Sequence, residues 1–357
     1  MKNIYFTVGP TQLYETYEKH MRSALDLQIG SLSHRGKEFK ALYQDTSELL
    51  REIFGLPKNF HIFLTASSLE NMERIIENTV AKKSFHVVTG AFGKRFYQTA
   101  VELGKKPTKI DVPSGQGWDS DALNIPEGTE LIALTQNDTS TGVVLPMKEI
   151  YALKKRQPDA LVAIDVVSSA PYVKIDWKYI DIAFFSVQKG FGLPAGLGLL
   201  VVSEKAVQKA RSLPEKGLSI GSYHNFVSMA EKEADWQTPE TPNVLNLWLL
   251  ARVCEDLLQK GMNVVRDETE EKGKLLVDFF SNHSEFTPFV KDTSYRSITS
   301  LVIDVNGRSN ELAEKLATKG IIIGKGYGDY KHTHIRLANF PSQKIEHVEK
   351  LLKTLRM

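Results

Sequence analysis

Between residues 60 and 205, short apolar runs alternate with longer stretches in which apolar residues recur every three or four positions. The short runs predict buried strands, and the longer stretches predict amphipathic helices. This alternation is typical of a mostly parallel sheet that helices cover on both faces. The expected strands are 61–65, 85–89, 130–135, 161–165 and 182–186, and the expected helices are 69–80, 93–103 and 147–156.

One connection departs from this alternation. The apolar runs 182–186 and 197–203 are joined by a short, glycine-rich stretch that contains Pro194. A crossover between parallel strands needs about a dozen residues or more, usually with a helix. We therefore expect an α/β fold whose large, mostly parallel sheet carries one antiparallel strand.

The C-terminal part of the chain has a different pattern. A long apolar helix is expected at 243–259, after Pro239 and Pro242. Strands at 300–305 and 334–337 and a helix from Gln343 follow, which is typical of an α+β unit. We predict a large domain at 16–242 and a smaller one formed by 243–357 together with 1–15.

Composition narrows the function classes. Of 357 residues, 42% are hydrophobic and 25% charged, and the net charge is only +2, without a long block of like charges. Nucleic-acid and membrane binding are therefore not expected. The single cysteine, Cys254, excludes an internal disulfide and a cysteine-based metal cluster, and no metal is expected. No apolar run approaches the roughly 20 residues that cross a bilayer, and residues 1–10 lack a signal-peptide pattern, so we expect a cytoplasmic protein.

Three positions with chemical potential lie where predicted strands end, which is where ligands bind in open α/β sheets. Lys189 follows 182–186 among small and apolar residues that would lower its pKa, as Schiff-base chemistry requires. Asp165 ends 161–165, where it caps the next helix or holds a cofactor's ring nitrogen protonated. Ser67 and Ser68 lie at the start of an expected helix. They are either ordinary N-cap residues or part of a phosphate-binding site.

The glycine pairs around Lys189 suggest a dinucleotide loop only superficially. Gly190 and Gly192, like Gly196 and Gly198, precede a strand instead of opening a helix, so the context of a dinucleotide fingerprint is missing. A strand-end lysine, a strand-end aspartate and a helix N-terminus together favour a pyridoxal 5'-phosphate enzyme.

Several segments resemble known aminotransferases. Residues 33–39 (SHRGKEF) and 188–197 (QKGFGLPAGL) resemble the N-terminal signature and the lysine motif of phosphoserine aminotransferases. Residues 137–142 (NDTSTG) and 165–169 (DVVSS) look more like alanine–glyoxylate and serine–pyruvate aminotransferases. Both families belong to class V of the fold-type I pyridoxal-phosphate enzymes. The resemblance runs from Phe6 to Arg336.

The resemblance implies a role for each matching residue. Lys189 would bind the cofactor covalently and then carry the proton between the substrate Cα and the cofactor. Arg336 would bind the substrate α-carboxylate; without the resemblance it is as well explained as a surface arginine. Phe92, otherwise a core residue, would stack on the ring. The other implied cofactor ligands are Asp165 at the ring nitrogen, Thr139 near the ring hydroxyl, and Ser67, Ser68 and Gln188 at the phosphate, with Gln237 and Thr238 supplied by the partner of a homodimer that shares its active sites.

The substrate is where the sequence departs from phosphoserine aminotransferases. Their His-Arg pair before the carboxylate-binding arginine, which binds the substrate phosphate, is absent from 326–333, and Asp329 there would repel a phosphate. Lys325, Lys331 and His332 are possible substitutes, and His34 and Arg35 remain available from the partner subunit.

The expected function is a phosphoserine aminotransferase of serine biosynthesis, acting on small amino and keto acids. An alanine–glyoxylate or serine–pyruvate type enzyme is the alternative. A catalytically silent, ligand-binding relative is the second alternative. A cysteine desulfurase is excluded, because Cys254 lies in an apolar helical pattern typical of a core residue.

Overall fold

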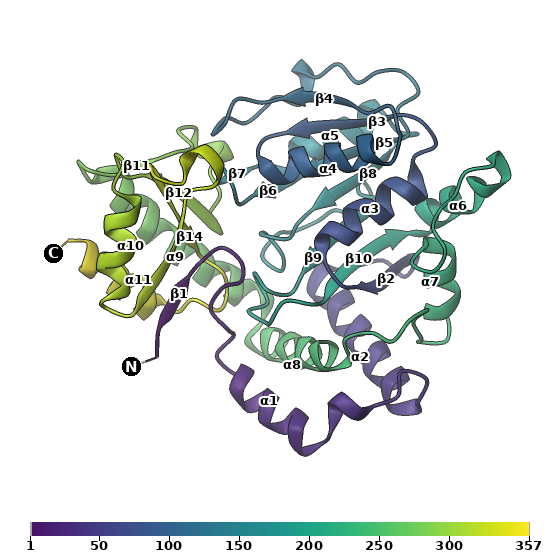
Figure 1. Cartoon of the computed structure of the whole chain (residues 1–357), viewed down its shortest axis with the longest axis horizontal. Coiled ribbons are helices and arrows are strands. Elements are labelled where there is room, and N and C mark those ends of the chain that lie inside the picture. The colour runs from purple at the N-terminus through teal and green to yellow at the C-terminus, as the bar shows by residue number, and fades with distance from the viewer. Residues whose placement is uncertain (1, 357) are drawn as a thin grey trace.

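The computed structural model describes residues 2–356, and two sheets of unequal size organise them (Figure 1). The larger sheet has seven strands in the spatial order β2 (Phe60–Thr65), β10 (Gly198–Ser203), β9 (Ile182–Ser186), β8 (Leu161–Asp165), β5 (Leu131–Thr135), β3 (Ser84–Val88) and β4 (Thr108–Asp111). The smaller sheet has the order β1 (Ile4–Phe6), β13 (Ile321–Lys325), β14 (His334–Ala338), β12 (Ser300–Asp304) and β11 (Thr287–Pro288). A short hairpin, β6 (Asn137–Asp138) with β7 (Val143–Val144), follows β5 in the chain and lies between the two sheets in Figure 1.

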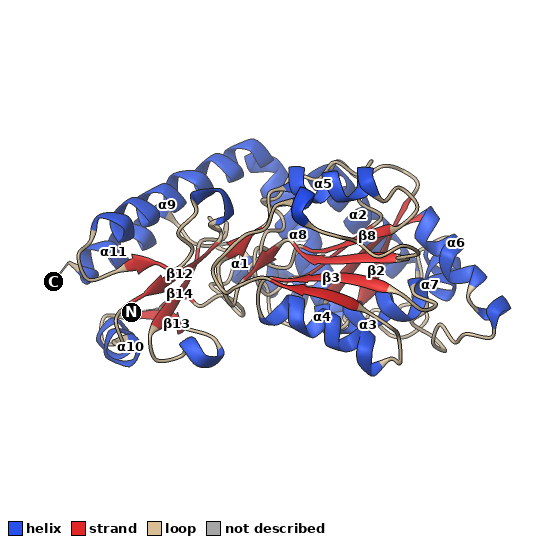
Figure 2. Cartoon of the chain, turned by 90° about the horizontal axis from the view of Figure 1, so that it is seen from above, coloured by secondary structure: helices blue, strands red, loops and turns tan. Residues whose placement is uncertain are grey.

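Helices cover both faces of the larger sheet and one face of the smaller sheet. In Figure 2, α2 and α5 lie on one face of the larger sheet and α3 and α4 on the other. On the smaller sheet, α9, α10 and α11 share one apolar core on the same face. The helices are α1 (Tyr17–Asp26), α2 (Lys37–Phe54), α3 (Ser68–Thr79), α4 (Ala91–Glu102), α5 (Met147–Arg156), α6 (Glu204–Ser212), α7 (Phe226–Glu233), α8 (Val244–Lys260), α9 (Met262–Asn282), α10 (Ser309–Ala317) and α11 (Ile345–Leu355). No helix within 2–356 is both long and apolar enough to span a membrane.

The predicted antiparallel strand is confirmed. β10 pairs antiparallel with both β9 and β2, whereas β9, β8, β5, β3 and β4 pair in parallel. In this register Gly198 lies opposite Ser186 on one side and Thr65 on the other. The carboxyl ends of β2 and β9 therefore meet at one edge of the sheet.

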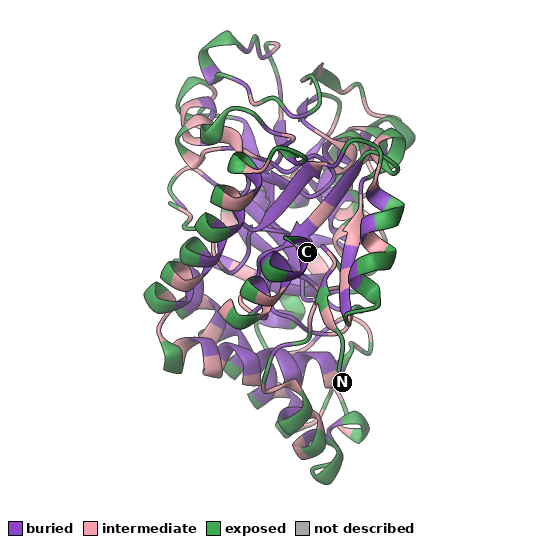
Figure 3. Cartoon of the chain, turned by 90° about the vertical axis from the view of Figure 1, so that its left-hand side faces the viewer, coloured by how far each residue is buried: buried purple, intermediate pink, exposed green. Residues whose placement is uncertain are grey.

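The elements with buried apolar runs agree best with the sequence. β8, β9 and α5 begin and end where the pattern predicts, and every residue of β8 and β9 is buried. Figure 3 shows buried residues concentrated in the strands and on the inner sides of the helices. β4 was not predicted, because it is an edge strand in which most residues are exposed. β1 has only three residues and depends on parallel pairing with β13, far away in the sequence.

The boundary between the two units lies at α8. Most of this helix belongs to the core of the larger unit, where Leu247, Leu250, Val253 and Cys254 are completely buried against its neighbours. The division expected from the sequence placed the whole helix in the smaller domain. Because its apolar face packs on the larger unit, we propose the turn at Gly261 as the junction in place of 242/243.

Candidate active site

Lys189 lies just beyond the carboxyl end of β9 and is only 8% exposed. Its Nζ donates a hydrogen bond to Thr139 Oγ1 at 3.1 Å and lies 5.0 Å from the centre of the Phe92 ring. The structure thus brings together three of the residues that the sequence singled out, from β9, the β6–β7 hairpin and α4.

The environment of Lys189 favours a nucleophilic amine. Burial lowers the pKa of Lys189 to about 8, and the charge of Arg336 acts in the same direction, whereas Asp165 and Asp138 oppose it. A larger fraction of the amine is therefore neutral near pH 8 than for a lysine in water, and only the neutral amine can attack a carbonyl carbon.

Asp165 lies at the end of β8, which is the parallel neighbour of β9. Burial raises the pKa of Asp165 to about 7, against the opposing effects of the Val167 N–H and Lys189. The Val167 N–H donates to Oδ1 at 2.9 Å, and within 2–356 it is the sole hydrogen-bond donor to this carboxyl group. A buried carboxylate with so little compensation fits a cationic ring N–H as its partner.

Two glycines allow the chain to approach this lysine. Gly9 has φ +135°, and a Cβ there would lie 2.7 Å from Lys189 Cε. A Cβ on Gly190 would overlap the carbonyl oxygen of Ala170, in the segment that follows Asp165. Close packing of backbone around Lys189 therefore requires glycine at both positions.

Asp138 holds the Phe92 side of the site in place, a role that the sequence analysis missed. Its carboxylate accepts hydrogen bonds from the N–H groups of Phe92 at 3.2 Å, Gly93 at 3.4 Å and Ser140 at 2.9 Å. The N-terminus of α4 is thereby tied to the hairpin that carries Thr139. The signal was available, because Asp138 belongs to the NDTSTG segment from which only Thr139 was selected.

The turn before α3 has the features of an anion site. Ser67 caps the helix by accepting from the Glu70 N–H at 3.2 Å, and Ser68 Oγ donates to Ser186 Oγ at 2.8 Å. No acceptor within 2–356 binds the N–H groups of Ser68 and Leu69 in the first turn of α3. Gln188 Oε1 is buried and has no hydrogen-bond partner among the described residues. Free N–H groups at the positive end of a helix suit a phosphate group.

Arg336 extends from β14 of the smaller sheet toward the same site. Its Nε donates to the Lys325 carbonyl at 2.8 Å, and Nη1 lies 3.4 Å from the Thr139 carbonyl oxygen. Its guanidinium lies 5.4 Å from the centre of the Tyr327 ring, and that ring lies 6.1 Å from Phe92. Tyr327, which the sequence did not single out, therefore covers the space between the arginine and the aromatic ring.

His34, Arg35, Gln237 and Thr238 form a separate group. Arg35 Nη1 donates to Gln237 Oε1 and to the Thr238 carbonyl, both at 2.8 Å, and His34 Nδ1 lies 3.4 Å from Thr241 Oγ1. No hydrogen bond within 2–356 connects this group to Lys189 or Asp165. The structure of one chain thus assembles the lysine site but does not bring these four residues to it.

Lys325, Lys331 and His332, the predicted substitutes for the arginine that binds the substrate phosphate, lie in different surroundings. Lys325 Nζ is engaged by Asn310 Oδ1 at 2.6 Å, so it is directed to α10. Lys331 and His332 are exposed next to Asp329 on the connection between β13 and β14. Neither makes a hydrogen bond to the residues around Lys189.

Comparisons with known proteins agree with this geometry. The family model "Aminotransferase class-V" matches residues 7–337. A phosphoserine aminotransferase of Rhodococcus opacus is 25% identical over 337 residues, which cover 92% of this chain and 89% of that protein. An uncharacterized aminotransferase of Methanocaldococcus jannaschii is 31% identical over 272 residues, which cover 73% of this chain and 68% of that protein. The crystal structure of a phosphoserine aminotransferase from Cytophaga hutchinsonii superposes with a TM-score of 0.97 and 44% identity, over 99% of this chain and 98% of that one.

Proposed function

The chain belongs to the class-V aminotransferase family, and we propose from this premise that it is a pyridoxal-phosphate-dependent phosphoserine aminotransferase. In this reaction an amino group passes between glutamate and 3-phosphohydroxypyruvate. The observation that carries the cofactor assignment is the buried pair of Lys189 and Asp165 at the ends of adjacent strands, with pKa values shifted toward each other. The choice of phosphoserine is supported by the relative from Cytophaga hutchinsonii, which matches nearly the whole chain.

The residues of the site would divide the work as follows. When bound, the cofactor supplies an electron sink for the negative charge that develops at the substrate Cα. Lys189 would hold the cofactor, and its released amine would move the proton at Cα, a task that a pKa near 8 suits. Asp165 would keep a proton on the ring nitrogen, and Arg336 would orient the substrate by its α-carboxylate. The remaining contacts would come from Phe92 and Thr139 at the ring and from Ser67, Ser68 and Gln188 at the phosphate.

The proposal includes a homodimer with shared active sites. Gln237 and Thr238, which the resemblance assigns to the cofactor phosphate, are held by Arg35 away from the lysine of their own chain. A second chain that supplies these residues would complete the site, together with His34 and Arg35. The cytoplasmic location expected from the sequence stays a prediction.

A serine–pyruvate or alanine–glyoxylate type activity is the second candidate. It is favoured because Lys325, the last residue of β13, is engaged by Asn310, and the connection from β13 to β14 has no arginine that could bind a substrate phosphate.

The visible absorption spectrum of the cofactor-loaded protein tests both candidates. L-phosphoserine should bleach the band of the lysine-bound cofactor and produce the pyridoxamine band, whereas L-alanine and L-serine should have little effect. A response to L-alanine or L-serine alone would favour the second candidate. If no visible band forms with the wild-type protein while Lys189→Ala gives the same spectrum, the aminotransferase proposal is wrong.

A further inference from the structure

His224 is a buried histidine held between two carboxylates, and it belongs to none of the motifs and has no role in the proposed reaction. The residue is 5% exposed and precedes α7. Its Nδ1 binds the carboxylate of Glu70, and its Nε2 lies 2.5 Å from Glu240 Oε2. The contact with Glu240 is an ion pair without the alignment of a good hydrogen bond.

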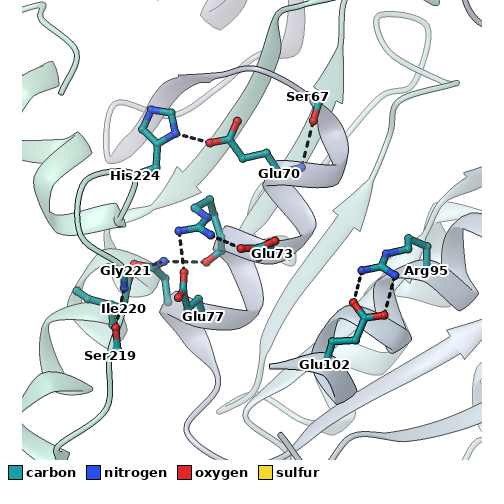
Figure 4. A network of polar contacts seen from close by, with 12 residues as sticks. Ser67, Glu70, Glu73, Glu77, Arg95, Glu102, Ser219, Ile220, Gly221 and His224 are labelled. Atoms are coloured by element: carbon teal, nitrogen blue, oxygen red, sulfur yellow. Dashed lines mark hydrogen bonds and ion pairs between the residues drawn. The ribbon is translucent and has the colours of Figure 1, made fainter. Parts of the chain in front are cut away.

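Glu70 connects this histidine to the proposed phosphate turn. It lies in the first turn of α3, where its carboxylate accepts from the Ala66 N–H at 2.7 Å and its own N–H donates to Ser67 Oγ at 3.2 Å. Figure 4 shows Glu70 between His224 and Ser67 at the end of this helix. A carboxylate beside a site for a phosphate would repel that anion unless its charge is neutralised.

Glu240 connects the same histidine to the segment that carries Thr238. Thr238 Oγ1 donates to the Glu240 carbonyl at 2.7 Å, and Arg35 Nη1 donates to the Thr238 carbonyl at 2.8 Å. Residues 238–240 are therefore held from one side by Arg35 and from the other by His224. In the proposed dimer this is the segment that reaches the cofactor phosphate of the other subunit.

We propose that His224 is a positioning residue of the phosphate site, because its imidazolium neutralises Glu70 beside the turn of Ser67 and Ser68 and anchors Glu240. Burial alone would lower the pKa of His224, but the interactions with Glu240 and Glu70 raise it to about 9, so the ring is charged at neutral pH. The inference rests on the proposed function, since it concerns how the proposed cofactor is bound.

The chain contains a matched control for such a histidine. His61, in β2, also lies between two glutamates, with Nδ1 2.5 Å from Glu233 and Nε2 3.0 Å from Glu204. Its ion pairs are with α7 and α6, and within 2–356 no hydrogen bond joins its side chain to the turn before α3. Loss of His61 should therefore reproduce the general cost of breaking a His–Glu cluster without changing the charge next to the phosphate turn.

The experiment measures binding of pyridoxal 5'-phosphate, and of pyridoxal without phosphate, to cofactor-free full-length protein by absorbance. The variants are His224→Gln, His61→Gln, Glu70→Gln and the double variant His224→Gln/Glu70→Gln, with thermal unfolding of each cofactor-free protein alongside. His224→Gln should weaken pyridoxal phosphate by about 5- to 30-fold, the effect of one unit charge several ångströms away near a protein surface. The affinity for pyridoxal should change less than about twofold, because pyridoxal has no phosphate that the carboxylate of Glu70, no longer neutralised by His224, could repel.

The outcomes separate the inference from the function on which it rests. If the double variant binds pyridoxal phosphate more tightly than His224→Gln does, the loss came from the uncompensated charge of Glu70, which supports the inference. If His224→Gln alone does not fold, the affinity of the double variant for pyridoxal phosphate tests the inference in its place. Equal loss in His224→Gln and His61→Gln, or equal loss for both ligands, overturns the inference while leaving the proposed enzyme intact. Failure of the wild-type protein to bind pyridoxal phosphate would instead overturn the proposed function.

Discussion

Replacing Asp165 with asparagine should stabilise the cofactor-free protein while it impairs catalysis. The carboxyl group is buried, and its pKa in the folded chain is about 7, against 3.8 for an aspartate in water. Because the folded-state pKa of an acid is raised, ionisation destabilises the folded state, and the deficit grows as pH rises from 3.8 to about 7. Below pH 3.8 both states are protonated and the deficit vanishes.

The magnitude follows from the pKa difference. One pKa unit corresponds to about 1.4 kcal/mol. The raised pKa of Asp165 therefore destabilises the folded state by ~4 kcal/mol at pH 8 and by ~1.6 kcal/mol at pH 5. Asparagine has nearly the same shape and carries no charge. The stability advantage of the variant over the wild type should therefore be larger at pH 8 than at pH 5 by roughly 2–3 kcal/mol. Such a destabilised group in the ligand-free protein is typical of a site that binds a charged ligand.

Urea unfolding of the cofactor-free wild type and of Asp165→Asn at pH 5 and pH 8 is the assay. Transamination by the loaded variant should fall by about 10²- to 10³-fold, because the ring nitrogen loses the charge that holds its proton. A stability difference that does not change between the two pH values would refute the reasoning, since it would mean that Asp165 is not desolvated. The matched control is Asp159→Asn, at an exposed position before β8, which should show no such pH dependence.

Three further predictions concern neighbouring residues. The rate at which cofactor-free protein binds pyridoxal phosphate covalently should rise with pH with a midpoint near 8, because burial lowers the pKa of Lys189 to about 8. Stopped-flow absorbance measures this rate, and a midpoint near 10.5 would contradict the prediction. Arg336→Lys should raise the KM for the amino acid about 10- to 100-fold with an unchanged cofactor band, because lysine cannot form the two-pronged contact; steady-state kinetics with an unaltered KM would remove Arg336 from the site. Gly9→Ala should destabilise the protein by about 1–3 kcal/mol and weaken cofactor binding, because φ is +135° and the new Cβ would lie 2.7 Å from Lys189 Cε; urea unfolding checks this against Gly307→Ala, where φ is also positive but space is open.

The strand-end residues of the site could be read from the sequence because they follow buried strands. The apolar runs of β8 and β9 predicted both boundaries, and Asp165 and Lys189 come at or just after them. The short connection before β10 predicted the antiparallel strand, because chain length alone forbids a parallel crossover there. Exposed or short elements such as β4 and β1 escaped the same analysis, since their residues show no buried pattern of their own.

The amino-acid sequence by itself thus determined which strands are buried, which reactive residues end them and which family the chain resembles. The tertiary structure alone decided which distant residues meet. Asp138 reaches the start of α4 across 46 positions, α8 packs on the larger unit, and His224 finds Glu70 across 154 positions. The physical reason is that periodicity reports how each residue is buried in its own element, whereas these contacts depend on strand order and on how the two units pack together.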